Sequence, residues 1–236
     1  MKLSVVIPCY NEAEGVTQLA SKLKEFEQNF TDRYELIFVD DGSSDSTYEE
    51  LTRLYKDRSG KDVKVIKHLE NRGVGAALKL GILSSEGDYV AAIDSDCTYE
   101  PVYLVEMFDI IRREKADIVT TSPYHPEGST IGVPGYRLFL SRNLSNLYSF
   151  LLKSKFYTYT SMFRIYRRDT IKNIDFKSDS FLAMAEILIK AHKKGFKVIE
   201  HPATLKSREF GASNAKTLKM IKEHLCFIFK LLVGKE

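Results

Sequence analysis

Short apolar runs alternate with helical patterns in the first half of the chain, and this alternation constrains the fold more than any other feature. Helical patterns that separate strand-like runs are typical of consecutive βαβ units, in which a mostly parallel sheet is covered by helices on both faces. We therefore expect an α/β fold of this kind. The predicted strands are residues 3–8, 34–39, 63–68, 89–93 and 117–121.

Acidic side chains follow three of these predicted strands. Glu12 follows the first, Asp41 the second, and Asp94 and Asp96 the fourth. The carboxyl ends of parallel strands meet at the edge of the sheet where such folds bind ligands. Convergence of acids at that edge favours a site for nucleotide phosphates.

Asp94 and Asp96 are one residue apart, so on an extended backbone their carboxylates point to the same side. Two neighbouring anions repel each other, and a hard cation such as Mg²⁺ or Mn²⁺ relieves that repulsion and also binds phosphates. We therefore expect a metal site here. The alternative is a strand end that exposes two solvated acids.

Composition excludes several classes of protein. The chain has 236 residues, of which 44% are hydrophobic, so it can bury a core, and a net charge of +3 argues weakly against a nucleic-acid binder. The spacing of Cys9, Cys97 and Cys226 does not match that of a zinc site, and we expect all three to be reduced thiols. With no apparent leader or membrane-spanning run, we expect a cytoplasmic protein, peripheral on the membrane at most.

The second half has a less regular pattern. We expect one domain over residues 1–213, divided into a nucleotide-binding half (1–122) and an acceptor half (123–213), and then a C-terminal amphipathic helix (214–236). The apolar stripe and lysines of that helix suit an anionic membrane surface, and they equally suit packing on the sheet or on a dimer partner. The other predicted elements are a loop (123–135), helices (136–153, 181–194) and strands (157–166, 196–205).

Gly73 and Gly75 resemble part of a dinucleotide-binding fingerprint, but the match is poor. The third glycine is missing, and the turn follows the third strand rather than the first. We expect instead that these glycines let the turn approach the sugar-phosphate region closely.

Four motifs together resemble a known family. They are VVIPCYNE (5–12), VDDGSSD (39–45), NRGVG (71–75) and DSD (94–96). In this order and spacing they resemble the family 2 inverting glycosyltransferases, which have the nucleotide-diphospho-sugar transferase (GT-A) fold. Within that family the chain is most similar to the polyprenyl-phosphate sugar synthases, the group that includes dolichol-phosphate mannosyltransferase.

The resemblance implies a role for individual residues. Asp41 would form hydrogen bonds with the base or ribose of the nucleotide. Asp94 and Asp96 would hold Mg²⁺ or Mn²⁺, with Asp96 the direct ligand. The other residues expected to bind the nucleotide sugar are Pro8, Tyr10, Glu12, Gly73, Ser95 and Ser213.

Two arginines and one glutamate are expected to act in catalysis. Arg137 and Arg208 would contact the lipid phosphate or the donor diphosphate, and the alternative for each is a solvated surface arginine. If the acceptor is a sugar hydroxyl, a base is needed, and Glu186 is the candidate. Its alternative is a charged position on a helix.

The chain departs from the lipid-phosphate mannosyltransferase pattern in three places. Thr98 stands where that pattern has glutamine, Pro123 stands where it has arginine, and residues 159–163 differ from its Pro-x-Ser-Gly-Phe segment. We therefore expect the donor class to follow the resemblance more closely than the acceptor does.

The expected function is transfer of a hexose from a GDP- or UDP-sugar to a polyprenyl (dolichyl or undecaprenyl) phosphate. One alternative is a family 2 enzyme that uses a saccharide hydroxyl as acceptor in surface polysaccharide synthesis. An alternative of another class is a nucleotide-sugar binding module without turnover. We expect no nucleic-acid partner.

Overall fold

The computed structural model describes residues 1–208 and 217–234. The strands are β1 (Lys2–Cys9), β2 (Arg33–Asp40), β3 (Val63–Lys67), β4 (Tyr89–Ala92), β5 (Ile118–Ser122), β6 (Ser129–Ile131), β7 (Arg164–Arg167), β8 (Val198–Pro202) and β9 (Thr204–Lys206). The helices are α1 (Val16–Asn29), α2 (Thr47–Leu54), α3 (Val74–Ser84), α4 (Tyr103–Arg113), α5 (Gly135–Leu152), α6 (Arg168–Lys172), α7 (Leu182–Lys193) and α8 (Thr217–Leu232), with short 3₁₀ turns η1 (Ala13–Gly15) and η2 (Lys56–Arg58).

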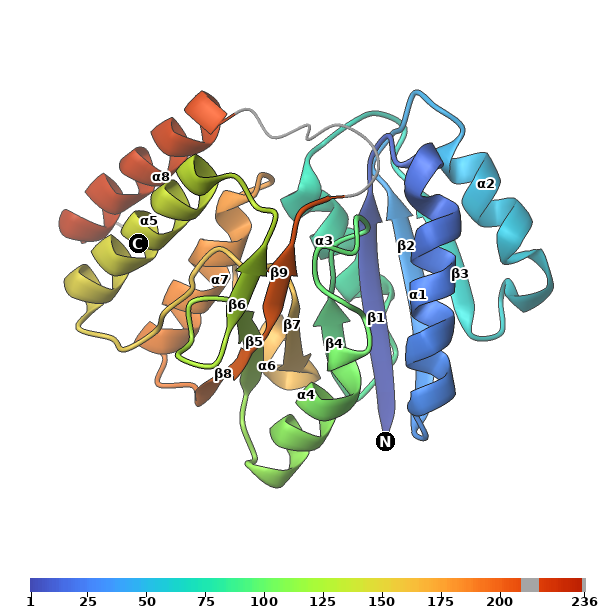
Figure 1. Cartoon of the computed structure of the whole chain (residues 1–236), viewed down its shortest axis with the longest axis horizontal. Coiled ribbons are helices and arrows are strands. Elements are labelled where there is room, and N and C mark those ends of the chain that lie inside the picture. Colours follow the sequence, from blue (N-terminus) through green and yellow to red (C-terminus); the bar gives the residue numbers. More distant parts are fainter. Residues whose placement is uncertain (209–216, 235–236) are drawn as a thin grey trace.

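A seven-stranded sheet in the order β3-β2-β1-β4-β7-β5-β8 runs through the middle of the molecule (Figure 1). Strands β1 to β4 pair in parallel, as do β5 and β8, whereas β7 runs antiparallel to both of its neighbours. The apolar runs of the central strands are buried on both faces, as a sheet between helical layers requires. The predicted α/β class with a mostly parallel sheet is confirmed.

Helices cover both faces of the sheet. On one face α1 and α4 pack through residues such as Leu23 and Phe108. On the other face α3 and α7 pack through residues such as Leu78 and Ile187. In the amphipathic helices α1 and α4 these buried residues recur three or four positions apart, and that spacing forms a continuous apolar stripe toward the strands.

The C-terminal helix α8 lies beside α5 at the end of the molecule farthest from β3 (Figure 1). Phe227 and Ile228 are buried with Tyr148 of α5 and Leu188 of α7. The predicted C-terminal helix is therefore present, and it packs on helices rather than on the sheet. Its outer face exposes a row of large apolar residues: Leu218, Ile221, Leu225, Phe229 and Leu232.

Three sequence predictions in the second half were wrong. The predicted strand 157–166 is a strand only from Arg164, because Tyr157 N and Thr158 N donate to the Glu200 carboxylate instead of pairing with a strand. The predicted strand 196–205 is divided at Ala203, where the chain leaves the large sheet. There it forms a two-stranded ribbon with β6, which lies in the predicted loop 123–135.

A buried hydrogen bond attaches α8 to α5. The Tyr148 hydroxyl lies 2.8 Å from His224 Nδ1. Burial lowers the pKa of His224 from 6.5 to about 4, against the opposing effect of Glu223. The neutral imidazole is therefore the form that the folded protein holds.

The stability of the protein should fall on acidification because of His224. A histidine with a depressed folded pKa contributes stability above its unfolded pKa and loses it as the pH falls toward the folded value. Between pH 7 and pH 5 we expect a loss of about 2 kcal/mol of unfolding free energy from this group. Urea unfolding of the wild type and of the Tyr148→Phe/His224→Phe double variant at both pH values measures the difference. Other groups titrate in both proteins, so equal pH slopes would contradict the assignment.

Candidate active site

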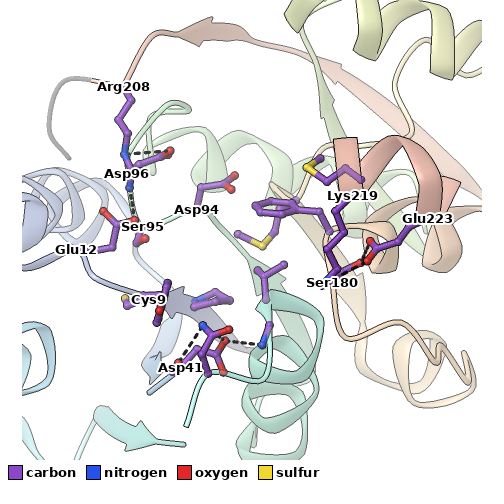
Figure 2. Close-up of a pocket in the computed structure, with 18 residues that line it drawn as sticks. Cys9, Glu12, Asp41, Asp94, Ser95, Asp96, Ser180, Arg208, Lys219 and Glu223 are labelled. Carbon is purple, nitrogen blue, oxygen red and sulfur yellow. Dashed lines mark hydrogen bonds and ion pairs between the residues drawn. The ribbon is translucent and has the colours of Figure 1, made fainter. Parts of the chain in front are cut away.

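A cavity of about 440 Å³ opens at the carboxyl ends of β1, β2 and β4 (Figure 2). The strand register sets Cys9 opposite Asp40 and Val6 opposite Ala92, so the loops that follow these strands leave the sheet side by side. We call this space the main cavity. Nine of the predicted site residues line it: Pro8, Tyr10, Glu12, Asp41, Gly73, Asp94, Ser95, Asp96 and Arg208.

The turn that carries Asp94 and Asp96 is tight. Thr98 N donates to Asp96 Oδ1 at 3.1 Å, and Cys97 adopts a left-handed backbone conformation with φ of 54°. A residue with a side chain adopts this conformation at a cost of about 1–2 kcal/mol. The strain is located directly beside the paired carboxylates, where a fixed side-chain direction matters for binding.

Arg208 lies between two of the cavity acids. Its guanidinium donates a hydrogen bond to Glu12 Oε1, and its Nε is 3.8 Å from Asp96 Oδ2. The backbone before it is fixed, because Lys206 N donates to Thr98 O at 2.9 Å. A planar guanidinium held in this way presents donors suited to phosphate oxygens.

The acidic side chains of the main cavity are buried close together, which disfavours their ionised forms. Burial raises the pKa of Glu12, although Arg208 opposes the shift. Burial and then the charge of Asp96 raise the pKa of Asp94 well above its usual range. A bound cation would relieve this repulsion, and carboxylate oxygens are the ligands that Mg²⁺ or Mn²⁺ prefers.

Asp94 and Asp96 therefore fit a divalent metal as a two-residue site. Within residues 1–208 and 217–234, no group of three or more histidine, cysteine or acidic side chains is arranged to bind a metal ion. Such sites take their remaining ligands from substrate phosphates and water.

Asp41 lines the main cavity, but its carboxylate is already engaged by the protein. Oδ1 lies 2.6 Å from His68 Nδ1 and 3.1 Å from Arg72 N, and Oδ2 accepts Gly73 N at 2.7 Å. Asn71 Nδ2 donates to the same oxygen at 3.0 Å. The geometry makes Asp41 the residue that holds the loop 71–73 against the cavity.

The two glycines of that loop lie where the backbone of another segment comes very close. A Cβ atom on Gly73 would lie 2.3 Å from the carbonyl oxygen of Asp179, and one on Gly75 would lie 2.4 Å from that of Ser178. Gly73 also has a φ of 101°, which favours glycine. The glycines pack against the backbone of residues 178–180, of which Ser180 lines the main cavity.

Two predicted residues, Arg137 and Glu186, lie outside the main cavity. Arg137 is exposed on the first turn of α5, where its Nε donates to Tyr136 Oη at 3.2 Å. Glu186 is 2% exposed and does not line the main cavity. Ser213 lies outside the described residues.

Glu186 has a structural role instead of the expected catalytic position. Its carboxylate accepts Lys177 N and Ser178 N, both at 2.9 Å, and it pairs with Lys190 at 2.6 Å. Glu186 thereby fixes Lys177 and Ser178 at the start of the loop that contains Ser180, which lines the main cavity. The geometry gives no support to its predicted role as a base.

Residues of α8 form a wall of the main cavity that the sequence did not indicate. Lys219, Met220 and Glu223 line the cavity, and Ser180 Oγ donates to Glu223 Oε2 at 2.6 Å. Figure 2 shows this group on the side facing Asp94. The apolar stripe in the sequence of α8 indicates a contact made by its outer face. No local sequence pattern indicates that the other side of this helix lines a cavity.

The profile of glycosyl transferase family 2 matches residues 4–175. The chain belongs to glycosyl transferase family 2. It is 31% identical over 234 residues to a dolichol-phosphate mannosyltransferase from Pyrococcus furiosus, with 98% of this chain and 64% of the relative aligned. The chain thus spans less than two thirds of that relative.

Two further proteins are similar. A polyprenol monophosphomannose synthase from Mycolicibacterium smegmatis is 29% identical over 218 residues, 89% of this chain and 79% of the relative. The crystal structure of glucosyl-3-phosphoglycerate synthase from Mycobacterium tuberculosis with Mn²⁺, UDP and glucosyl-3-phosphoglycerate superposes with a TM-score of 0.72. It shares 19% identity, and the match covers 98% of this chain and 79% of that one. The predicted GT-A fold is confirmed.

Proposed function

We propose that this protein transfers a hexose from a GDP- or UDP-sugar to a polyprenyl phosphate, with inversion at the anomeric carbon. The observation that carries the proposal is the meeting of Asp94, Asp96 and Arg208 at one edge of the sheet. Acids for a metal and a guanidinium for phosphate together suit a nucleoside diphosphate. The similarity to two polyprenyl-phosphate sugar synthases supports the lipid acceptor.

In the proposed reaction, an oxygen of the lipid phosphate attacks the anomeric carbon. The new bond joins that oxygen to the anomeric carbon, and the bond from the same carbon to the nucleoside diphosphate breaks on the opposite face. Arg208 stabilises the negative charge that gathers on the leaving diphosphate. Mg²⁺ or Mn²⁺ held by Asp94 and Asp96 would supply further neutralisation of that charge.

A lipid phosphate is already an anion near neutral pH, so this reaction needs no general base. The occupied carboxylate of Glu186, which Lys177, Ser178 and Lys190 contact, agrees with a mechanism that does not use it. A sugar hydroxyl acceptor would instead require a base within hydrogen-bond reach.

Transfer assays test the proposed function. The full chain is incubated with Mn²⁺ and radiolabelled GDP- and UDP-hexoses, either without an acceptor, with undecaprenyl phosphate, or with a saccharide acceptor. The proposal predicts labelled lipid only when the polyprenyl phosphate is present. Label in a saccharide acceptor alone, or nucleotide-sugar binding without turnover, would overturn it.

We also propose that the exposed apolar face of α8 contacts an anionic membrane. Leu225 and Phe229 are 58% and 65% exposed, and Lys222 and Lys230 are exposed on the same helix. Apolar side chains flanked by lysines suit an interface with acidic lipids. No helix within the described ranges is long and apolar enough to cross a membrane. A lipid acceptor would reach the main cavity beside its α8 wall.

Replacing Leu225 and Phe229 with glutamate should abolish membrane binding. Each of these apolar side chains would be buried in the lipid, and losing both removes about 3–6 kcal/mol of binding free energy. Affinity for phosphatidylglycerol vesicles should therefore fall at least about 100-fold. Co-sedimentation with vesicles measures this effect. Leu83→Glu is the matched control, since Leu83 is 81% exposed on α3 and should be neutral. Unchanged sedimentation of the double variant would reject this surface.

A further inference from the structure

The segment that ends at Arg208 is held against the turn that carries Asp96. Lys206 N donates to Thr98 O at 2.9 Å, and Thr98 N donates to Asp96 Oδ1 at 3.1 Å. Each partner in the backbone contact is two residues from a side chain of the site. How the two segments meet therefore sets the position of the guanidinium, whose Nε is 3.8 Å from Asp96 Oδ2 (Figure 2).

A second contact between the same two segments is made by side chains. Lys206 Nζ donates to Glu100 Oε1 at 2.6 Å, and Glu100 Oε2 is 3.0 Å from Lys22 Nζ. One carboxylate thus joins α1, the loop after β4, and β9. The Glu100 side chain is 16% exposed, so solvent screens these ion pairs less than it screens pairs on the open surface.

Glu100 keeps its negative charge in this setting. Burial acts to raise the pKa of its carboxyl group, but hydrogen bonds from Lys206 and Lys22 outweigh burial, and the pKa is lowered. An ionised carboxylate accepts shorter and stronger hydrogen bonds from ammonium groups than a neutral acceptor does. The ion pairs of Glu100 are therefore present near neutral pH.

The placement of β9 depends on contacts of this kind. The β6–β9 ribbon is separate from the seven-stranded sheet, so no strand pairing fixes β9 against the loop after β4. A single hydrogen bond, such as that from Lys206 N to Thr98 O, allows two segments to pivot about it. The Glu100 carboxylate lies beside that bond and restrains the pivot. Glu100 itself does not line the main cavity, so it acts there only through its neighbours.

We propose that Glu100 is a positioning residue that acts through Arg208, because its pairing with Lys206 fixes where the guanidinium meets the donor diphosphate. This inference rests on the proposed function. A displacement of about 1 Å in a group that stabilises the transition state can lower a rate by roughly 10²-fold. Loss of one of several restraints should have a smaller effect than loss of the arginine.

A double-mutant cycle between Glu100 and Arg208 tests the proposal. Glu100→Gln keeps the size of the side chain and removes the charge that attracts both lysines. In the wild-type background we expect it to lower kcat/KM for the nucleotide sugar by roughly 5- to 20-fold. In the Arg208→Ala background it should change kcat/KM by less than about twofold, because the group that it positions is already absent.

Two substitutions of the partner separate charge from side-chain shape. Lys206→Met removes the ammonium group and should lower kcat/KM as much as Glu100→Gln does, and combining the two should add little further loss. Lys206→Arg keeps a cation that can pair with Glu100 and should retain most of the activity. Urea unfolding of each variant shows whether it is folded under the assay conditions.

The control is a carboxylate that also pairs with two lysines but lies at the opposite end of β4. Glu86 is 3.1 Å from Lys2 Nζ and 2.7 Å from Lys64 Nζ, and Glu86→Gln should leave kcat/KM unchanged. Equal losses from Glu100→Gln with and without Arg208 would overturn the inference, because a general weakening of the fold acts in both backgrounds. Wild-type kinetics of Glu100→Gln would overturn it as well. A wild type that transfers no sugar and binds neither GDP nor UDP would refute the proposed function itself, and this inference with it.

Discussion

Asp96→Asn should lower the rate of sugar transfer by about 10³-fold or more. Asparagine keeps the shape of the side chain and an oxygen that can still accept Thr98 N. It removes the negative charge that Arg208 faces and that the proposed divalent metal would need. The loss should therefore appear in kcat, since the charge that the metal neutralises grows as the diphosphate leaves.

Steady-state kinetics over a range of Mn²⁺ concentrations measure this effect. Asp57→Asn is a suitable control, because Asp57 is an exposed acid in η2, away from the cavity, and its substitution changes the net charge equally. Wild-type turnover of Asp96→Asn at all Mn²⁺ concentrations would remove the metal assignment.

Arg208→Ala is expected to have the second largest effect, a loss of about 10²- to 10³-fold in kcat/KM. Two consequences combine here. The diphosphate loses a guanidinium donor, and Glu12 and Asp96 lose the cation that lies between them. Affinity for the nucleoside diphosphate product should fall as well.

Arg208→Lys separates charge from geometry. Lysine restores the positive charge without the planar fork, so we expect an activity between those of the alanine variant and the wild type. Arg53→Ala on α2 is the control, because Arg53 is exposed and pairs with Glu50 on the same helix. Normal kcat and KM in Arg208→Ala would show that the arginine does not contact the diphosphate.

The half of the site that follows β1, β2 and β4 was predictable from the sequence. Each of these strands is an apolar run that ends in acidic or polar residues, and parallel pairing brings such ends together without further information. Glu12, Asp94 and Asp96 are in the main cavity for this reason. The prediction of Arg208 as a site residue rested on the family resemblance. Its position depends on contacts with the loop that contains Thr98, and no local sequence pattern predicts those contacts.

The other half of the site depends on contacts between distant residues. Ser180, in the loop before α7, and Glu223 of α8 are 43 positions apart, and no periodic pattern in the sequence predicts that they meet. Segment 157–163 was misassigned because its threonine and aromatic residues suit a strand. In the structure the Glu200 carboxylate accepts hydrogen bonds from Tyr157 N and Thr158 N at the start of this segment. Thr158, Thr160 and Ser161 of the same segment line a smaller cavity of about 170 Å³.

We propose that Asp94, Asp96 and Arg208 bind a divalent ion together with a nucleoside diphosphate. The most direct test is a crystal structure of the full chain with Mn²⁺ and GDP or UDP, recorded with the anomalous signal of manganese. We expect the manganese peak about 2 Å from an Asp96 carboxylate oxygen, with the diphosphate between the metal and Arg208. A manganese peak or a nucleotide outside the main cavity would show that these three residues do not form the binding site.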